Sequence, residues 1–139
     1  MKKHSVLVVD DEKDMRTFLS TLLETEGYKP HIACDGLEGF EKARLLKPAL
    51  IILDVMMPEE DGVQLYRKIK TDLDLKDIPV VMLSGIAKRT FLHCQGVLSA
   101  QLGRSVPEPE AYIEKPLEPE ELLEVTERIL KGRGEKAPL

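Results

Sequence analysis

The stretch Ala49-Leu50-Ile51-Ile52-Leu53-Asp54 decides the fold of this chain. Consecutive apolar residues are typical of a central strand in a parallel sheet, because helices cover both faces of such a strand. The run ends on a carboxylate, Asp54, and the carboxyl ends of parallel strands form the edge where open α/β sheets bind ligands. The stretch therefore predicts a doubly wound α/β fold with a polar site at the end of this strand.

Three other apolar runs end in the same way, on residues that handle phosphate or metal ions. These runs, with the polar residues that follow, are Ser5–Val9 with Asp10 and Asp11, Val80–Leu83 with Ser84, and Ala111–Glu114 with Lys115. If all four runs are strands of one parallel sheet, their polar residues meet at one edge. Three carboxylates, one hydroxyl and one lysine are the inventory of a Mg²⁺ and phosphoryl site.

Helical patterns separate the apolar runs. Met15, Phe18, Leu19, Leu22 and Leu23 follow the spacing of one helix face, and we expect this helix to begin at Asp11 or Glu12 and to end at Gly27. Further elements are predicted as a strand over Lys29–Cys34 with an Asp35-Gly36 turn, and as helices over Leu37–Leu46, Asp61–Thr71, Lys88–Leu102 and from Pro119 onward. This alternation predicts a parallel sheet with helices on both faces and right-handed crossovers.

Length and composition narrow the class of protein. The chain has 139 residues, which is the size of one domain, and we expect the folded part to cover 1–131 and a frayed tail to cover 132–139. The net charge of −5 and a pI near 5.3 argue against direct nucleic-acid binding, which needs a basic stripe. Cys34 and Cys94 lack metal-ligand spacing, so they are interpreted as reduced thiols.

Neither a membrane span nor an export signal is predicted. No run approaches the roughly 20 apolar residues of a transmembrane helix. The apolar run that follows Met1 to His4 is short and leads into two aspartates, so we interpret it as a strand. The expected location is the cytoplasm.

The predicted edge has a definite chemistry. Asp10, Asp11 and Asp54 would repel one another, and their pKa values would rise unless a cation such as Mg²⁺ neutralised them. A carboxylate is also a competent nucleophile toward phosphorus, which would give an aspartyl phosphate. Lys115 suits one phosphoryl oxygen as a point charge, and the Ser84 hydroxyl suits another as a donor. Each residue type is common at strand ends, so the signal lies in their joint occurrence.

The chain resembles the receiver domains of two-component response regulators. The matching stretches are Val6-Leu7-Val8-Val9-Asp10-Asp11-Glu12, Leu53-Asp54-Val55-Met56-Met57-Pro58, Asp61-Gly62, Val80-Val81-Met82-Leu83-Ser84-Gly85, and Tyr112-Ile113-Glu114-Lys115-Pro116. They span nearly the whole sequence. The resemblance implies a flavodoxin-like (βα)5 fold, with five parallel strands and five helices.

The resemblance also implies a role for each site residue. Asp54 would be the phosphoacceptor, and Asp11, Asp54 and the backbone carbonyl of Met56 would bind Mg²⁺, with Asp10 assisting through a water. Lys115 would pair with the phosphoryl group, Ser84 would move toward it, and Tyr112 would turn inward as the aromatic switch. Pro58 and Gly62 would shape the adjacent loop. The chain would be a phosphoacceptor rather than a true enzyme, catalysing only its own phosphorylation and dephosphorylation.

The partners follow from the same resemblance. A histidine kinase or phosphotransfer protein would donate the phosphoryl group, and the signal would pass to a downstream protein that the sequence does not identify, or to a second copy of the chain. No output domain is recognisable, so we expect a stand-alone regulator. The link from Gly85 to Glu114 departs from the family pattern, because it is long and carries Pro-Glu-Pro-Glu at 107–110. Met56 and Ile86 are apolar at positions that tune dephosphorylation, which predicts a long-lived acyl phosphate.

Three other functions fit the sequence less well. A phosphatase of the haloacid-dehalogenase type needs a second acid two residues after its nucleophile, where this chain has Met56. A degenerate receiver that acts only as a binding module would lack an acidic residue or the lysine, and none is missing. Dinucleotide binding is disfavoured because no G-x-G-x-x-G follows the first strand.

Overall fold

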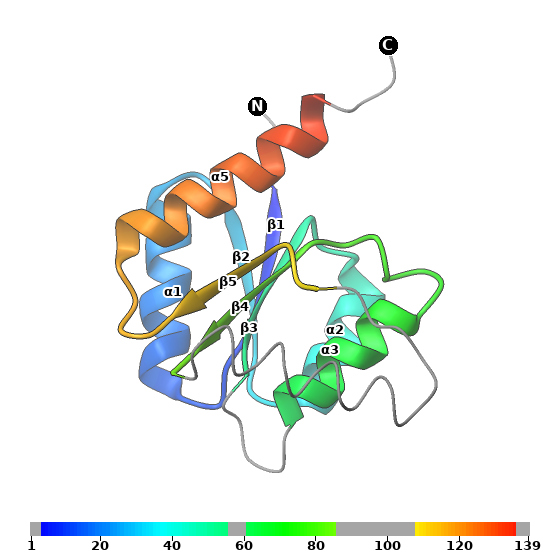
Figure 1. Ribbon diagram of the computed structural model, residues 1–139. Helices are drawn as coiled ribbons and strands as arrows, with labels where there is room; N and C mark the ends of the chain where they lie inside the picture. The colour runs from blue at the N-terminus through cyan, green and yellow to red at the C-terminus, as the bar shows by residue number, and fades with distance from the viewer. Residues whose placement is uncertain (1–3, 56–60, 86–107, 136–139) are drawn as a thin grey trace.

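The computed structural model describes residues 4–55, 61–85 and 108–135. The elements in chain order are β1 (Ser5–Val9), α1 (Lys13–Thr25), β2 (Lys29–Ala33), α2 (Gly36–Leu46), β3 (Leu50–Asp54), α3 (Asp61–Thr71), β4 (Val80–Ser84), β5 (Ala111–Glu114) and α5 (Pro119–Glu135). Figure 1 shows their arrangement around one central sheet. The predicted helix over Lys88–Leu102, and the positions of Met56, Pro58 and Ile86, lie outside the described residues.

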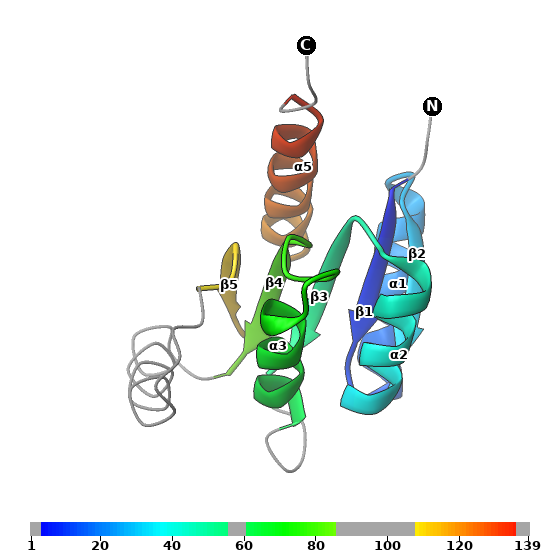
Figure 2. The same ribbon diagram turned by 90° about the vertical axis from the view of Figure 1, so that its right-hand side faces the viewer.

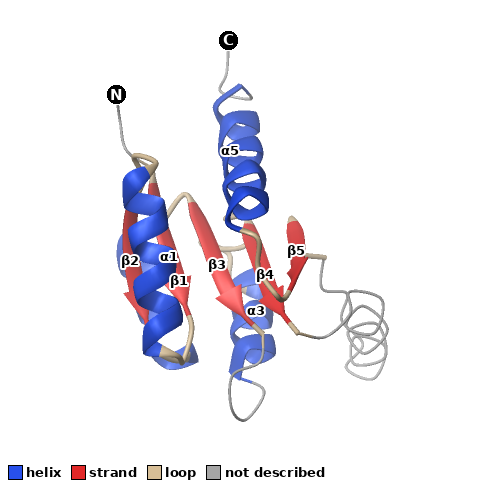
Figure 3. Cartoon of the chain, turned by 90° about the vertical axis from the view of Figure 1, so that its left-hand side faces the viewer, coloured by secondary structure: helices blue, strands red, loops and turns tan. Residues whose placement is uncertain are grey.

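The sheet has five parallel strands in the order β2-β1-β3-β4-β5. All strands run in the same direction, so their carboxyl ends lie at one edge (Figure 3). β3 is buried at every residue, as its continuous apolar sequence predicts, and it lies in the middle of the sheet. The predicted doubly wound, flavodoxin-like fold is therefore confirmed.

Two apolar cores lie on opposite faces of the sheet. Side chains alternate between the faces along each strand, so Leu7 and Val9 of β1 join one core while Val6 and Val8 join the other. The first core is completed by α2 and α3, through residues such as Ala43 and Tyr66. The second core is completed by α1 and α5, and Figure 2 shows the helices on the two sides of the sheet.

Local signals account for the helix boundaries. α1 follows Glu12, and the chain leaves it at Gly27, whose φ of +88° favours glycine. Asp35 is the N-cap of α2, because its side chain accepts a hydrogen bond from the backbone N–H of Glu38. The predicted Asp35-Gly36 turn is thus a helix start, one residue before the expected boundary. α3 and β5 have the predicted bounds.

The prediction that a frayed tail begins at residue 132 is wrong. α5 begins at Pro119 as predicted but continues to Glu135, well past the expected end at residue 131. The stripe that anchors this helix is buried or half-buried and includes Leu122, Val125 and Leu130. Once such a helix is anchored, each added residue forms one more backbone hydrogen bond, so two glycines do not end it.

Candidate functional site

The structure brings the predicted polar residues to one edge of the sheet. Asp54 and Ser84 are the last residues of β3 and β4, while Asp10 and Lys115 directly follow β1 and β5. These strands are consecutive neighbours in the sheet, which explains how residues so distant in sequence come together. Lys115 is fixed at the edge by its backbone N–H, which donates to the carbonyl of Ser84 at 2.7 Å.

Asp54 and Lys115 form an ion pair at the centre of this edge. Lys115 Nζ lies 3.5 Å from Asp54 Oδ1, and the side chains are 23% and 2% exposed. A buried carboxylate needs a positive charge close by, and the ammonium group of Lys115 supplies it. The pair thus presents a nucleophilic oxygen beside a partly accessible ammonium group.

Asp10 is fully buried next to this pair. Its Oδ1 accepts a hydrogen bond from the Glu12 backbone N–H at 2.9 Å, whereas Oδ2 has no hydrogen-bond partner among the described residues. Burial raises the pKa of Asp10 to about 6, the Glu12 N–H opposes this rise, and the charge of Asp54 adds to it. The protein therefore holds a carboxylate that gains strongly from an added positive charge.

The residues present fit a hard divalent cation. Carboxylate oxygens of Asp10, Asp11 and Glu12 can all lie within 4.8 Å of one another, and the orphan Oδ2 of Asp10 lacks only a positive partner. Glu12 was not among the ligands predicted from the sequence, where it figured only as a helix start. Its adjacency to the aspartate pair was the available signal. Met56, whose carbonyl was a predicted ligand, lies outside the described residues.

The two predicted switch residues interact. Ser84 is fully buried and Tyr112 is half-buried against the core formed with α2 and α3. Burial raises the pKa of Tyr112, and a hydrogen bond with the Ser84 side chain partly opposes this rise. A movement of Ser84 would therefore be felt by Tyr112 on the neighbouring strand.

Gly62 allows α3 to begin directly against the phosphoacceptor candidate. A Cβ atom at this position would overlap the carbonyl oxygen of Asp54 and would lie 2.9 Å from Val55 Cα. Backbone atoms cannot yield as a flexible side chain can, so the close approach requires glycine. This gives a physical reason for the Asp61-Gly62 motif noted in the sequence.

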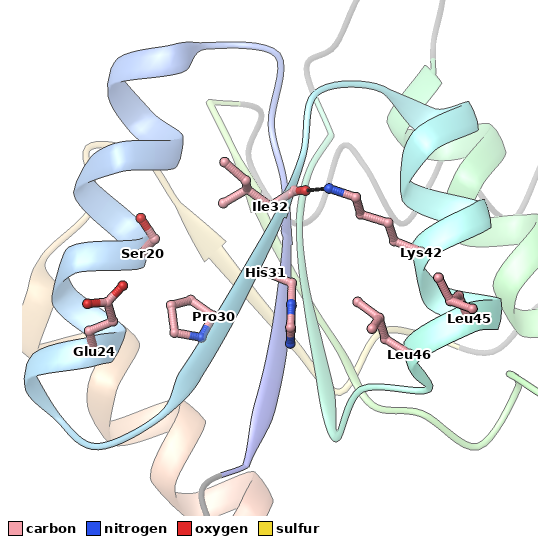
Figure 4. A pocket seen from close by; sticks show the side chains of 8 residues that line it. All are labelled: Ser20, Glu24, Pro30, His31, Ile32, Lys42, Leu45 and Leu46. Atoms are coloured by element: carbon pink, nitrogen blue, oxygen red, sulfur yellow. Dashed lines mark hydrogen bonds between the residues drawn. The ribbon is translucent and has the colours of Figure 1, made fainter.

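A surface hollow of about 510 Å³ lies elsewhere, at the free edge of β2 (Figure 4). Its lining comes from the later part of α1, from β2 and from the end of α2, and consists of Ser20, Glu24, Pro30, His31, Ile32, Lys42, Leu45 and Leu46. Lys42 Nζ donates to the Ile32 carbonyl at 2.5 Å across this edge. Asp10, Asp11 and Glu12 do not line the hollow, so it is separate from the candidate phosphoryl site.

Comparison with known sequences identifies the class. The sequence matches the response regulator receiver domain family over residues 6–127. The chain therefore belongs to this family, which acts in two-component signalling. In the described residues, no helix is both long enough and apolar enough to cross a membrane.

Individual relatives support this assignment. The chain is 31% identical to response regulator Rre1 of Synechocystis sp., over 91% of this chain and 51% of the relative. It is 34% identical to PhoP of Bacillus subtilis, an alkaline phosphatase synthesis transcriptional regulatory protein, over 96% and 51%. The chain thus spans about half the length of these curated relatives.

The solved structures agree with the fold. Chemotaxis response regulator CheY4 of Vibrio cholerae has a TM-score of 0.77 at 26% identity, with 92% of this chain and 99% of that chain covered. The receiver domain of a signal transduction histidine kinase from Syntrophus aciditrophicus has a TM-score of 0.77 at 30% identity, with 98% and 96% covered. The same fold therefore occurs in differently organised signalling proteins.

Proposed function

We propose that this protein accepts a phosphoryl group on Asp54 from a phosphohistidine of a kinase or phosphotransfer protein. An Asp54 carboxylate oxygen forms the new bond to phosphorus while the bond between phosphorus and the histidine nitrogen breaks. The leaving nitrogen keeps the electron pair and takes a proton. The observation that carries this proposal is the buried Asp54 carboxylate with Lys115 Nζ at 3.5 Å and Asp10 beside it.

Mg²⁺ is the expected cofactor, held by Asp10, Asp11 and Asp54 together with the Met56 carbonyl. When bound, it would offset the negative charge of the carboxylates and of the incoming phosphoryl oxygens. Asp10 would contribute the orphan Oδ2, which the protein itself leaves without a partner among the described residues. Lys115 would pair with one phosphoryl oxygen, and the Ser84 hydroxyl would donate to another.

The phosphoryl group would act as a switch. If the Ser84 hydroxyl donates to a phosphoryl oxygen, its hydrogen bond with Tyr112 would change. Phosphorylation would therefore alter the surface near β5. We propose that this surface contacts a downstream protein or a second copy of the chain, without direct nucleic-acid binding. The protein would act in the cytoplasm and would catalyse no reaction other than its own phosphorylation and dephosphorylation.

Acetyl phosphate with Mg²⁺, followed by intact mass spectrometry, tests the chemistry. The wild type is expected to gain one phosphoryl adduct, and Asp54→Asn is expected to gain none. Asp14→Asn is the matched control, because Asp14 is an exposed aspartate in the first turn of α1. An adduct that persists in Asp54→Asn would assign the phosphoacceptor to another residue. A haloacid-dehalogenase-like phosphatase would instead hydrolyse the donor with steady turnover.

A further inference from the structure

Arg16 connects α1 to the acidic loop through the backbone of Asp10. Its guanidinium Nη1 donates to the Asp10 carbonyl at 2.8 Å, while the Asp10 N–H donates to Ala33 of β2 at 3.1 Å. Asp10 has no exposed surface, so without Arg16 its buried carbonyl would lose this donor. The arginine therefore satisfies the carbonyl that immediately follows β1.

This hydrogen bond constrains the peptide that joins Asp10 to Asp11. A peptide unit is planar, so fixing its carbonyl also fixes the direction in which the chain leaves toward Asp11. The Glu12 N–H donates to a carboxylate oxygen of Asp10, Oδ1, at 2.9 Å. Together, the two bonds restrain both the backbone and the side chain of Asp10, whose carboxylate lies within 4.8 Å of those of Asp11 and Glu12.

The charge of Arg16 acts at the same sheet edge. The Glu38 side chain is the main cause of a raised pKa at the Cys34 thiol, and the positive charge of Arg16 opposes that rise. The guanidinium therefore lies close enough to act on the end of β2 as well as β1. Its hydrogen bond goes to a backbone carbonyl rather than to a carboxylate.

We propose that Arg16 is a positioning residue for the metal-binding loop. It would hold the Asp10–Asp11 peptide so that both carboxylates are preorganised for Mg²⁺. The proposal rests on the proposed function, since that function supplies the metal. Residues that orient metal ligands in this indirect way typically change metal affinity by about 10- to 100-fold when they are replaced.

Calorimetric titration of Mg²⁺ into the full chain tests this role. Arg16→Met keeps the aliphatic stem and removes the donor, and it is expected to weaken Mg²⁺ binding by about 10-fold. Lys13→Met is the matched control, because it removes the same charge from an exposed position at the start of the same helix. The control is expected to bind Mg²⁺ within about twofold of the wild type, since charge at an exposed site is screened.

Hydrogen exchange in EDTA gives a second reading that needs no metal. The Glu12 amide donates a hydrogen bond to Asp10 Oδ1, and we expect it to exchange faster in Arg16→Met than in the wild type. Its exchange rate is expected to be unchanged in Lys13→Met. If Arg16→Met fails to fold, Arg16→Gln replaces it, because its amide is too short to span the same distance. Unchanged Mg²⁺ affinity in the Arg16 variant, or an equal loss in Lys13→Met, would overturn the proposal. A wild type that binds no Mg²⁺ would instead contradict the proposed function.

Discussion

The ammonium of Lys70 lies 3.1 Å from Oε1 of Glu110, forty residues further along the chain. The lysine side chain is 2% exposed and also donates to the carbonyls of Ile78 at 2.9 Å and Lys76 at 3.3 Å. Oε1 of Glu110 accepts a second hydrogen bond, from the Val80 N–H at 2.6 Å. One buried charge thus links the end of α3, the start of β4 and the approach to β5.

Lys70→Met is expected to destabilise the protein by about 1–3 kcal/mol, because it leaves buried carbonyls without a donor. Urea unfolding measures this loss. Lys68→Met is the control, since Lys68 is exposed on the same helix. The double variant Lys70→Met with Glu110→Gln should cost less than the sum of the two single changes. Strict additivity would show that the two residues do not act as a pair.

Asp10 should make stability depend on pH in the absence of metal. Its pKa is about 6 in the folded protein and 3.8 without the fold, so the folded state binds more protons in this window. The free energy of unfolding therefore decreases as the pH rises through the window. The penalty is complete above about pH 6, where it amounts to about 3 kcal/mol.

Asp10→Asn is expected to remove this penalty. In EDTA, the variant should gain stability over the wild type as the pH rises from 4 to 7, as measured by urea unfolding. Saturating Mg²⁺ should narrow the difference, since the cation stabilises the charged form of Asp10. A constant difference at every pH would mean that Asp10 does not titrate in this range.

Gly62→Ala is expected to destabilise the protein by about 3 kcal/mol, because the new methyl group would overlap the backbone at Asp54. Phosphorylation by acetyl phosphate should fall as well, since Asp54 would be displaced. Gly132→Ala is the control, because a Cβ atom there meets nothing within 4 Å and the residue lies inside α5. That change should stabilise the helix by up to about 1 kcal/mol. Equal effects at both glycines would refute the close-approach argument.

Ser84→Ala is expected to raise the pKa of Tyr112 further, because it removes the hydrogen bond that lowers it. Carbon-13 NMR of labelled tyrosine across alkaline pH would measure the change. Tyr28 is the internal control, since its raised pKa arises from burial and from Glu127 and Glu26. A shift of Tyr28 by the same amount would indicate a general loss of structure.

The parts predicted well from the sequence were those with strong local signals. The apolar run before Asp54 predicted the central strand, and helical spacing placed Leu19 and Leu23 on one helix face, where both are fully buried. The juxtaposition of Asp54 and Lys115 followed from sheet topology, because parallel strands place their carboxyl ends together. The roles of these residues in phosphoryl transfer stay predictions.

The parts missed were contacts between distant segments. From the sequence alone, Lys70 would be taken for a surface lysine, because its partner Glu110 lies beyond β4 and the link that follows it. Arg16 likewise reads as a solvent-facing helix residue, and only the fold shows that it reaches back to the Asp10 carbonyl. The extent of α5 was also missed, because glycine propensity is a weak guide when a packed stripe anchors the helix.

The outer edge of β2 has one further consequence. Strand alternation places the backbone groups of Pro30 and Ile32 on the side away from β1, where proline offers no donor and Lys42 occupies the Ile32 carbonyl. At this edge, few backbone groups are available to form hydrogen bonds with an additional strand. The sheet is thus terminated on this side, which protects the protein from edge-to-edge polymerisation when many copies are crowded together.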